Sequence, residues 1–127
     1  MLTPEAILMF MRRLDAEASE SSPGGEWVFA NGESVFQCTT SARRVAKEFG
    51  GRLVGFLGED NPDAEIGKGE NGHDFAIIAE RFIVDYWGAH VVSVIDRAVF
   101  DLTDTADEAI VARLYGSKHT WRTVSLK

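Results

Sequence analysis

The sequence predicts an α+β fold in which N-terminal helices pack on an antiparallel β-sheet, and three observations support this prediction. Apolar residues recur at helical spacing in two early stretches, over about 4–18 and 38–49. β-rich runs follow at 73–78 and 82–87, and only three residues separate them, which is typical of an antiparallel hairpin. The length of 127 residues matches the commonest domain size, so residues 1–127 are expected to form a single domain.

The first helix is expected over about 4–18 because its N-terminus carries several start signals. Thr3 is a good N-cap, Pro4 suits the first helical position, and Glu5 places an acid in the first turn. The stretch at 19–25 is rich in serine and glycine, a composition typical of a loop. The helix should therefore end there.

The second helix is expected to begin at Cys38, the only cysteine of the chain. Ala42, Val45, Ala46 and Phe49 fall on one helical stripe with it, so the sulfur should face inward. Two consecutive glycines then supply a C-terminal stop. A thiol at a helix N-terminus meets unpaired N–H groups and the positive end of the helix dipole, which favour the nucleophilic thiolate.

The rest of the chain completes the predicted sheet. Residues 52–57 are strand-like, and a polar loop with several glycines follows over about 58–72. Loops of this length in a small domain are more often functional flaps than spacers. A third β stretch is expected at about 91–100, a third helix over 104–116 and a last edge strand at 120–126.

The register of the predicted hairpin decides which side chains share a face. With a three-residue loop centred on Glu80, Asp85 lies opposite Phe75 and on the same face as His73, one diagonal step away. A two-residue turn at Glu80-Arg81 would place Asp85 and His73 on opposite faces. The sequence leaves both registers open.

The charge of the chain argues against some classes of partner. A net charge of −7 with only Arg43-Arg44 as a basic cluster does not suit a nucleic-acid backbone, whereas a basic protein partner or a cationic substrate would fit. No apolar run approaches the roughly 20 residues that span a membrane. The N-terminus lacks the features of a secretory signal, so a cytoplasmic location is expected, with delivery as a secreted effector left open.

Three side chains form a candidate catalytic constellation: Cys38 at a helix start, His73 at the start of a strand and Asp85 near the end of the next strand. A thiol nucleophile needs a base within hydrogen-bond reach, and the imidazole needs a carboxylate or amide that holds its tautomer. Gly72 would let a substrate backbone approach the imidazole closely. Trp87 could shield the dyad, line an acyl pocket or simply be a core aromatic.

This order of residues resembles the papain-like cysteine superfamily, and most of all its transglutaminase-like branch. The resemblance is carried by Gln37-Cys38, Gly72-His73 and Asp85, and it covers roughly the middle two-fifths of the chain. It implies a small papain-like core in which Cys38 is the nucleophile, His73 the general base and acid, and Asp85 its orienter. It also implies that the backbone N–H of Cys38 helps bind the oxyanion, with assistance from Gln37 or an upstream polar residue.

The implied reaction is thiol-dependent acyl transfer to, or hydrolysis of, an amide or ester, as in a thiol protease, amidase or deamidase. A protein or peptide amide is the expected substrate. Hydrolysis or deamidation is favoured over cross-linking, because water is the acceptor wherever no dedicated amine pocket exists.

The alternative interpretation is a non-enzymatic acidic interaction module, of the inhibitor or immunity type, in which Cys38 is a structural core residue. The negative charge would accelerate its encounter with a cationic protein. No cofactor or metal is expected. The spacings of Cys38, His73, His90 and His119 match no zinc motif, and the acids of the 58–72 loop lack the alternation of a calcium loop.

Overall fold

The computed structural model describes residues 2–19, 27–66 and 71–126. The helices are α1 (Pro4–Ser19), α2 (Cys38–Phe49) and α3 (Thr105–Tyr115). The strands are β1 (Arg52–Leu57), β2 (Gly72–Ile78), β3 (Phe82–Val84), β4 (Val99–Asp101) and β5 (Arg122–Val124). Short helical turns lie at η1 (Gly58–Asp60), η2 (Trp87–Val91) and η3 (Lys118–Thr120).

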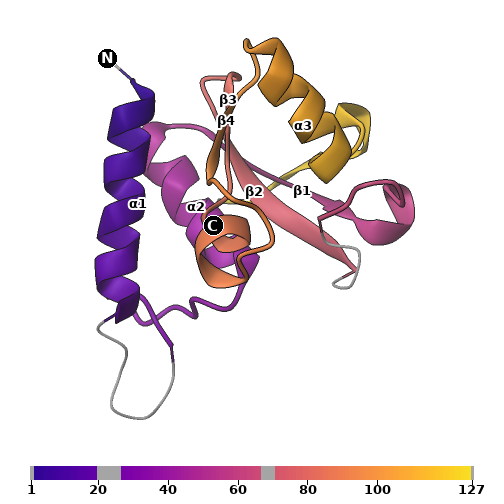
Figure 1. Cartoon of the computed structure of the whole chain (residues 1–127). Coiled ribbons are helices and arrows are strands. Elements are labelled where there is room, and N and C mark those ends of the chain that lie inside the picture. Colours follow the sequence, from indigo (N-terminus) through magenta and orange to yellow (C-terminus); the bar gives the residue numbers. More distant parts are fainter. Residues whose placement is uncertain (1, 20–26, 67–70, 127) are drawn as a thin grey trace.

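The predicted α+β class is confirmed. The five strands form one sheet in the order β4-β3-β2-β1-β5, and each neighbouring pair is antiparallel. Figure 1 shows α1 and α2 on one side of this sheet and α3 on the other. The sheet therefore separates two apolar cores, one facing α1 and α2 and one facing α3.

The predicted helices are confirmed to within a residue or two, because their caps are formed as the sequence indicates. Thr3 Oγ1 accepts a hydrogen bond from the N–H of Ala6 at the start of α1. Gly50 ends α2 in the left-handed conformation with φ 67°. Asp104 caps α3 through its side chain. The predicted loop at 19–25 lies outside the described residues except for the last residue of α1.

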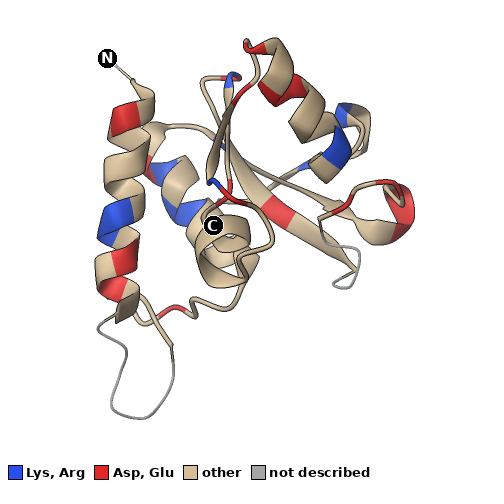
Figure 2. Cartoon of the chain, in the orientation of Figure 1, with Lys and Arg blue, Asp and Glu red and all other residues tan. Residues whose placement is uncertain are grey.

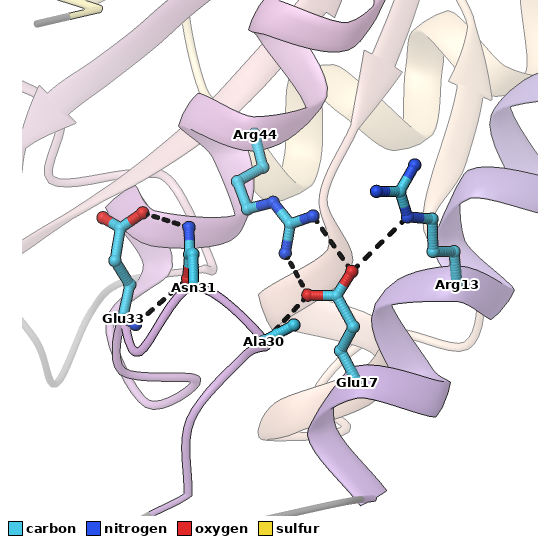
Figure 3. Close-up of polar contacts among 6 residues, drawn as sticks. All are labelled: Arg13, Glu17, Ala30, Asn31, Glu33 and Arg44. Carbon is cyan, nitrogen blue, oxygen red and sulfur yellow. Dashed lines mark hydrogen bonds and ion pairs between the residues drawn. The ribbon is translucent and has the colours of Figure 1, made fainter.

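A polar cluster joins α2 to α1, as Figure 3 shows. Arg44 of α2 donates two hydrogen bonds to the carboxylate of Glu17 on α1, at 2.5 and 3.0 Å. Arg13 lies 3.5 Å from the same carboxylate, and the N–H of Ala30 donates to it at 2.9 Å. The hydrogen bond from Arg44 outweighs the effect of burial and lowers the pKa of Glu17. This cluster fixes the orientation of the helix that begins at Cys38.

Strands β2 and β3 form the predicted hairpin with the three-residue loop. Ile78 pairs with Phe82, which leaves residues 79–81 as the connection. Asp85 follows directly after the paired strand and therefore lies on the same face as His73. Of the two registers that the sequence left open, the one that brings these side chains together is present.

The predicted strand over 82–87 is wrong in its second half, and Trp87 does not lie on a strand. β3 ends at Val84, and the chain then coils into the π-helical turn η2. Gly88 makes this path possible, because a Cβ at its position would lie 2.7 Å from Oδ2 of Asp85. The backbone thus wraps closely around the carboxylate.

The predicted strand over 91–100 is also wrong for most of its length, since only its last residues belong to β4. The N–H groups of Val94 and Ile95 bond to the carbonyl oxygen of Gly88, at 2.9 and 3.3 Å. Ser93 has a positive φ of 54°. Both features bend the chain out of an extended conformation.

The loop predicted over 58–72 is shorter, and part of it is packed. Its first residues form η1, and β2 already begins at Gly72. The N–H of Ile66 bonds to the carbonyl oxygen of Leu114 on α3 at 2.9 Å, so the middle of the loop is attached to that helix. Residues 67–70 lie outside the described part.

Charged residues are spread over several elements. Figure 2 shows basic positions on α1 and α2, and acidic positions on α1, on α3 and on the loop after β1.

Among the helices of the described residues, none is both long and apolar enough to cross a lipid bilayer.

Candidate active site

The candidate site lies at the end of the sheet where β3 stops. β3 pairs with only the last three residues of β2, so the first half of β2, which carries His73, has no pairing with β3. Asp85, η2 and the start of α2 occupy this position instead. The three predicted catalytic side chains, Cys38, His73 and Asp85, meet here.

Cys38 is the first residue of α2, and its side chain is free and partly accessible. One side-chain contact ties the start of the helix to β2, and another lies within its first turn. The hydroxyl of Thr39 bonds to the carboxylate of Asp74 on β2, and the hydroxyl of Ser41 bonds to the carbonyl oxygen of Cys38 at 3.4 Å. The first N–H groups of a helix have no partner within it, so donors remain available beside the thiol.

His73 and Asp85 form a buried dyad. Nε2 of His73 lies 2.7 Å from Oδ2 of Asp85, and each side chain is only 1% exposed. Burial of this kind is costly unless both groups are paired and hydrogen-bonded. The pairing therefore fixes the orientation of the imidazole.

The Cys38 thiol lies close enough to His73 to help raise the pKa of the imidazole. Because Asp85 occupies Nε2, the ring nitrogen left for the thiol is Nδ1. The imidazole thus has the carboxylate on one ring nitrogen and the cysteine close by, which is the combination that a thiol nucleophile and its base require. These contacts join α2, β2 and the end of β3, three segments far apart in the sequence.

The electrostatic setting favours a protonated imidazole. Burial alone would lower the pKa of His73, but the charge and hydrogen bond of Asp85, together with the contact to Cys38, raise it to about 10. His73 therefore carries a proton near neutral pH. A positively charged imidazole next to a cysteine sulfur is a setting typical of reactive thiols.

Asp85 is held by two further donors. The N–H of Gly88 donates to its Oδ1 at 3.0 Å, and the hydroxyl of Tyr115 donates to its Oδ2 at 2.7 Å. Tyr115 comes from the last turn of α3 and is fully buried. Neither Tyr115 nor Gly88 could be identified from the sequence. A tyrosine on the apolar stripe of a helix has the pattern of an ordinary core residue.

Trp87 covers the dyad. Its ring centroid lies 5.2 Å from that of His73, and its indole N–H donates to the carbonyl oxygen of Phe36 at 2.7 Å. Trp87 is 9% exposed, whereas Phe36, two residues before the cysteine, is 62% exposed. Trp87 thus packs on the imidazole as a buried aromatic, which suits both a core residue and a shield, and its predicted role stays a prediction.

Gly72 and Gln37 lie next to the catalytic candidates, but their predicted roles stay predictions. Gly72 has φ 142°, and a Cβ there would lie 2.2 Å from the carbonyl oxygen of Phe56 on β1. The close approach of β1 is thus enough to require glycine at this position. Gln37 is exposed at the N-cap of α2, and its side chain makes no capping hydrogen bond.

A second histidine–carboxylate pair lies on the other side of η2. Nδ1 of His90 is 2.8 Å from Oδ1 of Asp15, which also accepts a hydrogen bond from the hydroxyl of Tyr86 at 2.8 Å. This pair is partly exposed and has no cysteine beside it.

Across the described ranges, no group of three or more histidine, cysteine or acidic side chains is placed to hold a metal ion.

The fold and the site together define an α+β protein with a Cys-His-Asp constellation whose nucleophile candidate begins a helix. No protein-family model matches the chain, and neither a curated protein nor a solved structure matches it.

Proposed function

We propose that the protein is a thiol-dependent hydrolase or acyltransferase that acts on amides or esters. The observation that carries the proposal is the His73 imidazole, which is paired through Nε2 with the buried Asp85 carboxylate and lies close to the partly exposed residue Cys38. A thiol, an imidazole and an orienting carboxylate in contact form the minimal apparatus for acyl transfer through a thioester.

The reaction begins with the Cys38 sulfur as thiolate and His73 as imidazolium. The sulfur attacks the carbonyl carbon of the substrate, a C–S bond forms, and the carbonyl oxygen becomes an oxyanion. His73 then gives its proton to the leaving nitrogen or oxygen, the bond to the carbonyl carbon breaks, and the amine or alcohol departs. The enzyme is left as a thioester at Cys38, with a neutral imidazole.

Water or an amine completes the cycle. His73 takes a proton from the acceptor, whose oxygen or nitrogen attacks the thioester carbon. The C–S bond breaks, and the thiolate and imidazolium are restored. Asp85 keeps the imidazole in place through both proton transfers and stabilises its charge. Hydrolysis or deamidation is favoured over amine transfer, since water serves wherever no amine is bound.

The start of α2 supplies the proposed oxyanion site. The backbone N–H of Cys38 belongs to the first turn of the helix, where donors are unpaired and the helix dipole favours negative charge. Gln37 is exposed beside it, and its side chain caps no backbone group, so its amide is available as a second donor.

The proposed relationship is to the transglutaminase-like branch of the papain-like superfamily. Its support is the order of the elements: the cysteine begins α2, the histidine lies at the start of β2, and the aspartate follows the neighbouring strand β3. A protein or peptide amide is the proposed substrate class, and a basic protein would suit the charge of −7.

The test uses p-nitrophenyl acetate as a generic acyl donor, followed by intact-mass analysis of the native protein. We expect a mass increase of one acetyl group on Cys38 and its later loss by hydrolysis, neither of which should occur in Cys38→Ala. His73→Gln should abolish turnover. His90→Gln is the matched control, because it disrupts the other histidine–carboxylate pair, and it should leave turnover unchanged.

A thiol that reacts only after the protein is denatured would overturn the proposal. So would equal turnover in His73→Gln and the wild type. In either case the chain would be better described as a non-enzymatic acidic interaction module in which Cys38 is structural.

A further inference from the structure

Tyr115 and His73 donate to the same oxygen atom of Asp85. The Tyr115 hydroxyl and Nε2 of His73 each lie 2.7 Å from Oδ2, while Oδ1 accepts a hydrogen bond from the N–H of Gly88. All three side chains are buried. The hydrogen-bonding capacity of Oδ2 is therefore shared between a neutral phenol and the imidazole.

The position of Tyr115 is fixed from both ends. Its carbonyl oxygen accepts hydrogen bonds from the side-chain amide of Asn61 at 2.7 Å and from the indole N–H of Trp121 at 2.8 Å. Its ring centroid lies 4.7 Å from that of Phe75 on β2. The backbone and the ring of Tyr115 are thus both held by contacts, and these place its hydroxyl at Asp85.

The hydroxyl also stays protonated. Burial, together with the charge and hydrogen bond of Asp85, raises the pKa of Tyr115 well above its ordinary value. Tyr115 therefore donates to Oδ2 throughout the pH range in which His73 titrates. Among the described residues, the titratable groups that face His73 are Cys38 from α2, Asp85 after β3 and Tyr115 from α3. The ring centroid of Tyr115 lies 6.1 Å from that of His73, and its hydroxyl acts on His73 through Asp85. The other ring contacts of His73, Phe75 and Trp87, are uncharged.

We propose that Tyr115 is a positioning residue that acts on His73 through Asp85. The Tyr115 hydroxyl uses part of the hydrogen-bonding capacity of Oδ2. Asp85 therefore still orients the imidazole, but it binds the imidazole proton less strongly. A carboxylate with a single partner concentrates its charge on that partner, whereas a second donor disperses it. The catalytic consequence rests on the proposed function, in which His73 must release this proton to the leaving group.

The test compares Tyr115→Phe with Tyr86→Phe, the matched control at the only other tyrosine of the chain. Tyr86 also donates to a carboxylate, but to Asp15, away from the dyad. The readout is the NMR titration of the His73 imidazole Hε1. Without the phenol, Asp85 retains the imidazole proton more strongly. We expect Tyr115→Phe to shift the His73 titration to higher pH by about half to one unit, a roughly three- to tenfold change in proton affinity.

A purely structural role predicts the opposite sign. If Tyr115 only braced Asp85, its loss would loosen the dyad and move the titration of His73 to lower pH. A downward shift or no shift in Tyr115→Phe therefore overturns the proposal, as does a shift of equal size in Tyr86→Phe.

A second measurement keeps the test decisive if Tyr115→Phe does not fold. In Tyr86→Phe, Tyr115 is the only tyrosine, so 3-fluorotyrosine can be incorporated at that position alone. The fluorinated phenol is a stronger donor, and we expect the His73 titration to move to lower pH. An unchanged or raised titration overturns the proposal. None of these readouts requires turnover, so a failed acyl-transfer assay would refute the proposed function separately.

Discussion

Removal of the Asp85 carboxylate should destabilise the fold strongly, because three buried donors lose their acceptor. Asp85→Ala leaves Nε2 of His73, the hydroxyl of Tyr115 and the N–H of Gly88 without a partner. Breaking a buried ion pair from one side costs about 3–5 kcal/mol, and each neutral orphaned donor costs roughly 1–3 kcal/mol, without full additivity. We expect a loss of about 3–5 kcal/mol in the free energy of unfolding.

The assay is urea unfolding at neutral pH, with Asp15→Ala as control. The side chain of Asp15 is 46% exposed, so water can replace its carboxylate as the acceptor, and its removal should cost no more than about 1 kcal/mol. Asp85→Asn keeps one carbonyl oxygen as acceptor and should fall between the two variants. A loss below about 1 kcal/mol for Asp85→Ala, or one equal to that of Asp15→Ala, would refute the view that the dyad is a buried pair.

The same dyad gives a pH dependence of defined sign. Folding raises the pKa of His73 from 6.5 to about 10, since the charge and hydrogen bond of Asp85 outweigh burial. The folded state therefore binds more protons than the unfolded state between these values. The contribution of the dyad is fully present below about pH 6.5 and is lost as the pH rises through about 10. Asp85→Asn should flatten this loss, and a decrease as steep as in the wild type would contradict it.

Three further predictions concern the surroundings of the dyad. Glu17→Gln should lower stability by about 1–2 kcal/mol at neutral pH, because Arg44 loses its charged partner. Folding lowers the pKa of Glu17, so the stability difference between Glu17→Gln and the wild type, measured by urea unfolding, should vanish as the pH falls through that lowered pKa. A difference that persists in acid would contradict the pairing of Glu17 with Arg44. Trp87→Phe removes the hydrogen bond to Phe36 and should lower the free energy of unfolding by roughly 1 kcal/mol. It should also expose the imidazole of His73 to solvent, which NMR would detect as faster exchange of the imidazole N–H protons. Unchanged exchange would argue against shielding by Trp87. Gly72→Ala should lower the free energy of unfolding, measured by thermal unfolding, by about 2 kcal/mol or more, because the new Cβ would lie 2.2 Å from a backbone oxygen. A neutral effect would show that β1 does not approach Gly72 as closely as described.

Several elements of the fold could be predicted because local chemistry specifies them. The start of α2 at Cys38 and its end at Gly50 follow from apolar spacing and a glycine that adopts a positive φ. The hairpin follows from two β-rich runs with a three-residue connection at 79–81. The sequence leaves the register of this hairpin open, so it predicts the candidate site from the types and order of its three side chains. The structure shows the register that places the histidine and the aspartate on one face.

The failures share a physical cause. The run after Asp85 is rich in β-forming residues, but its backbone bonds go to the carbonyl oxygens of Trp87 and Gly88 and form a helical turn. Propensity for β structure depends on the neighbours that a strand finds, and here the carboxylate and its donors replace a neighbouring strand. The contact of Tyr115 with Asp85 could not be predicted from the sequence, because the two residues lie 30 positions apart.

The sequence alone determined the α+β class, the helix that begins at the single cysteine and the identity of the three candidate side chains. These features could be predicted because periodicity, caps and turn lengths depend on residues that are close together in the sequence. Only the tertiary structure decided that His73 bonds Asp85 through Nε2, that Trp87 packs against the imidazole and that Tyr115 donates to the same oxygen atom of Asp85. Those contacts join segments from α2 to α3, and their geometry depends on how the two cores pack against the sheet.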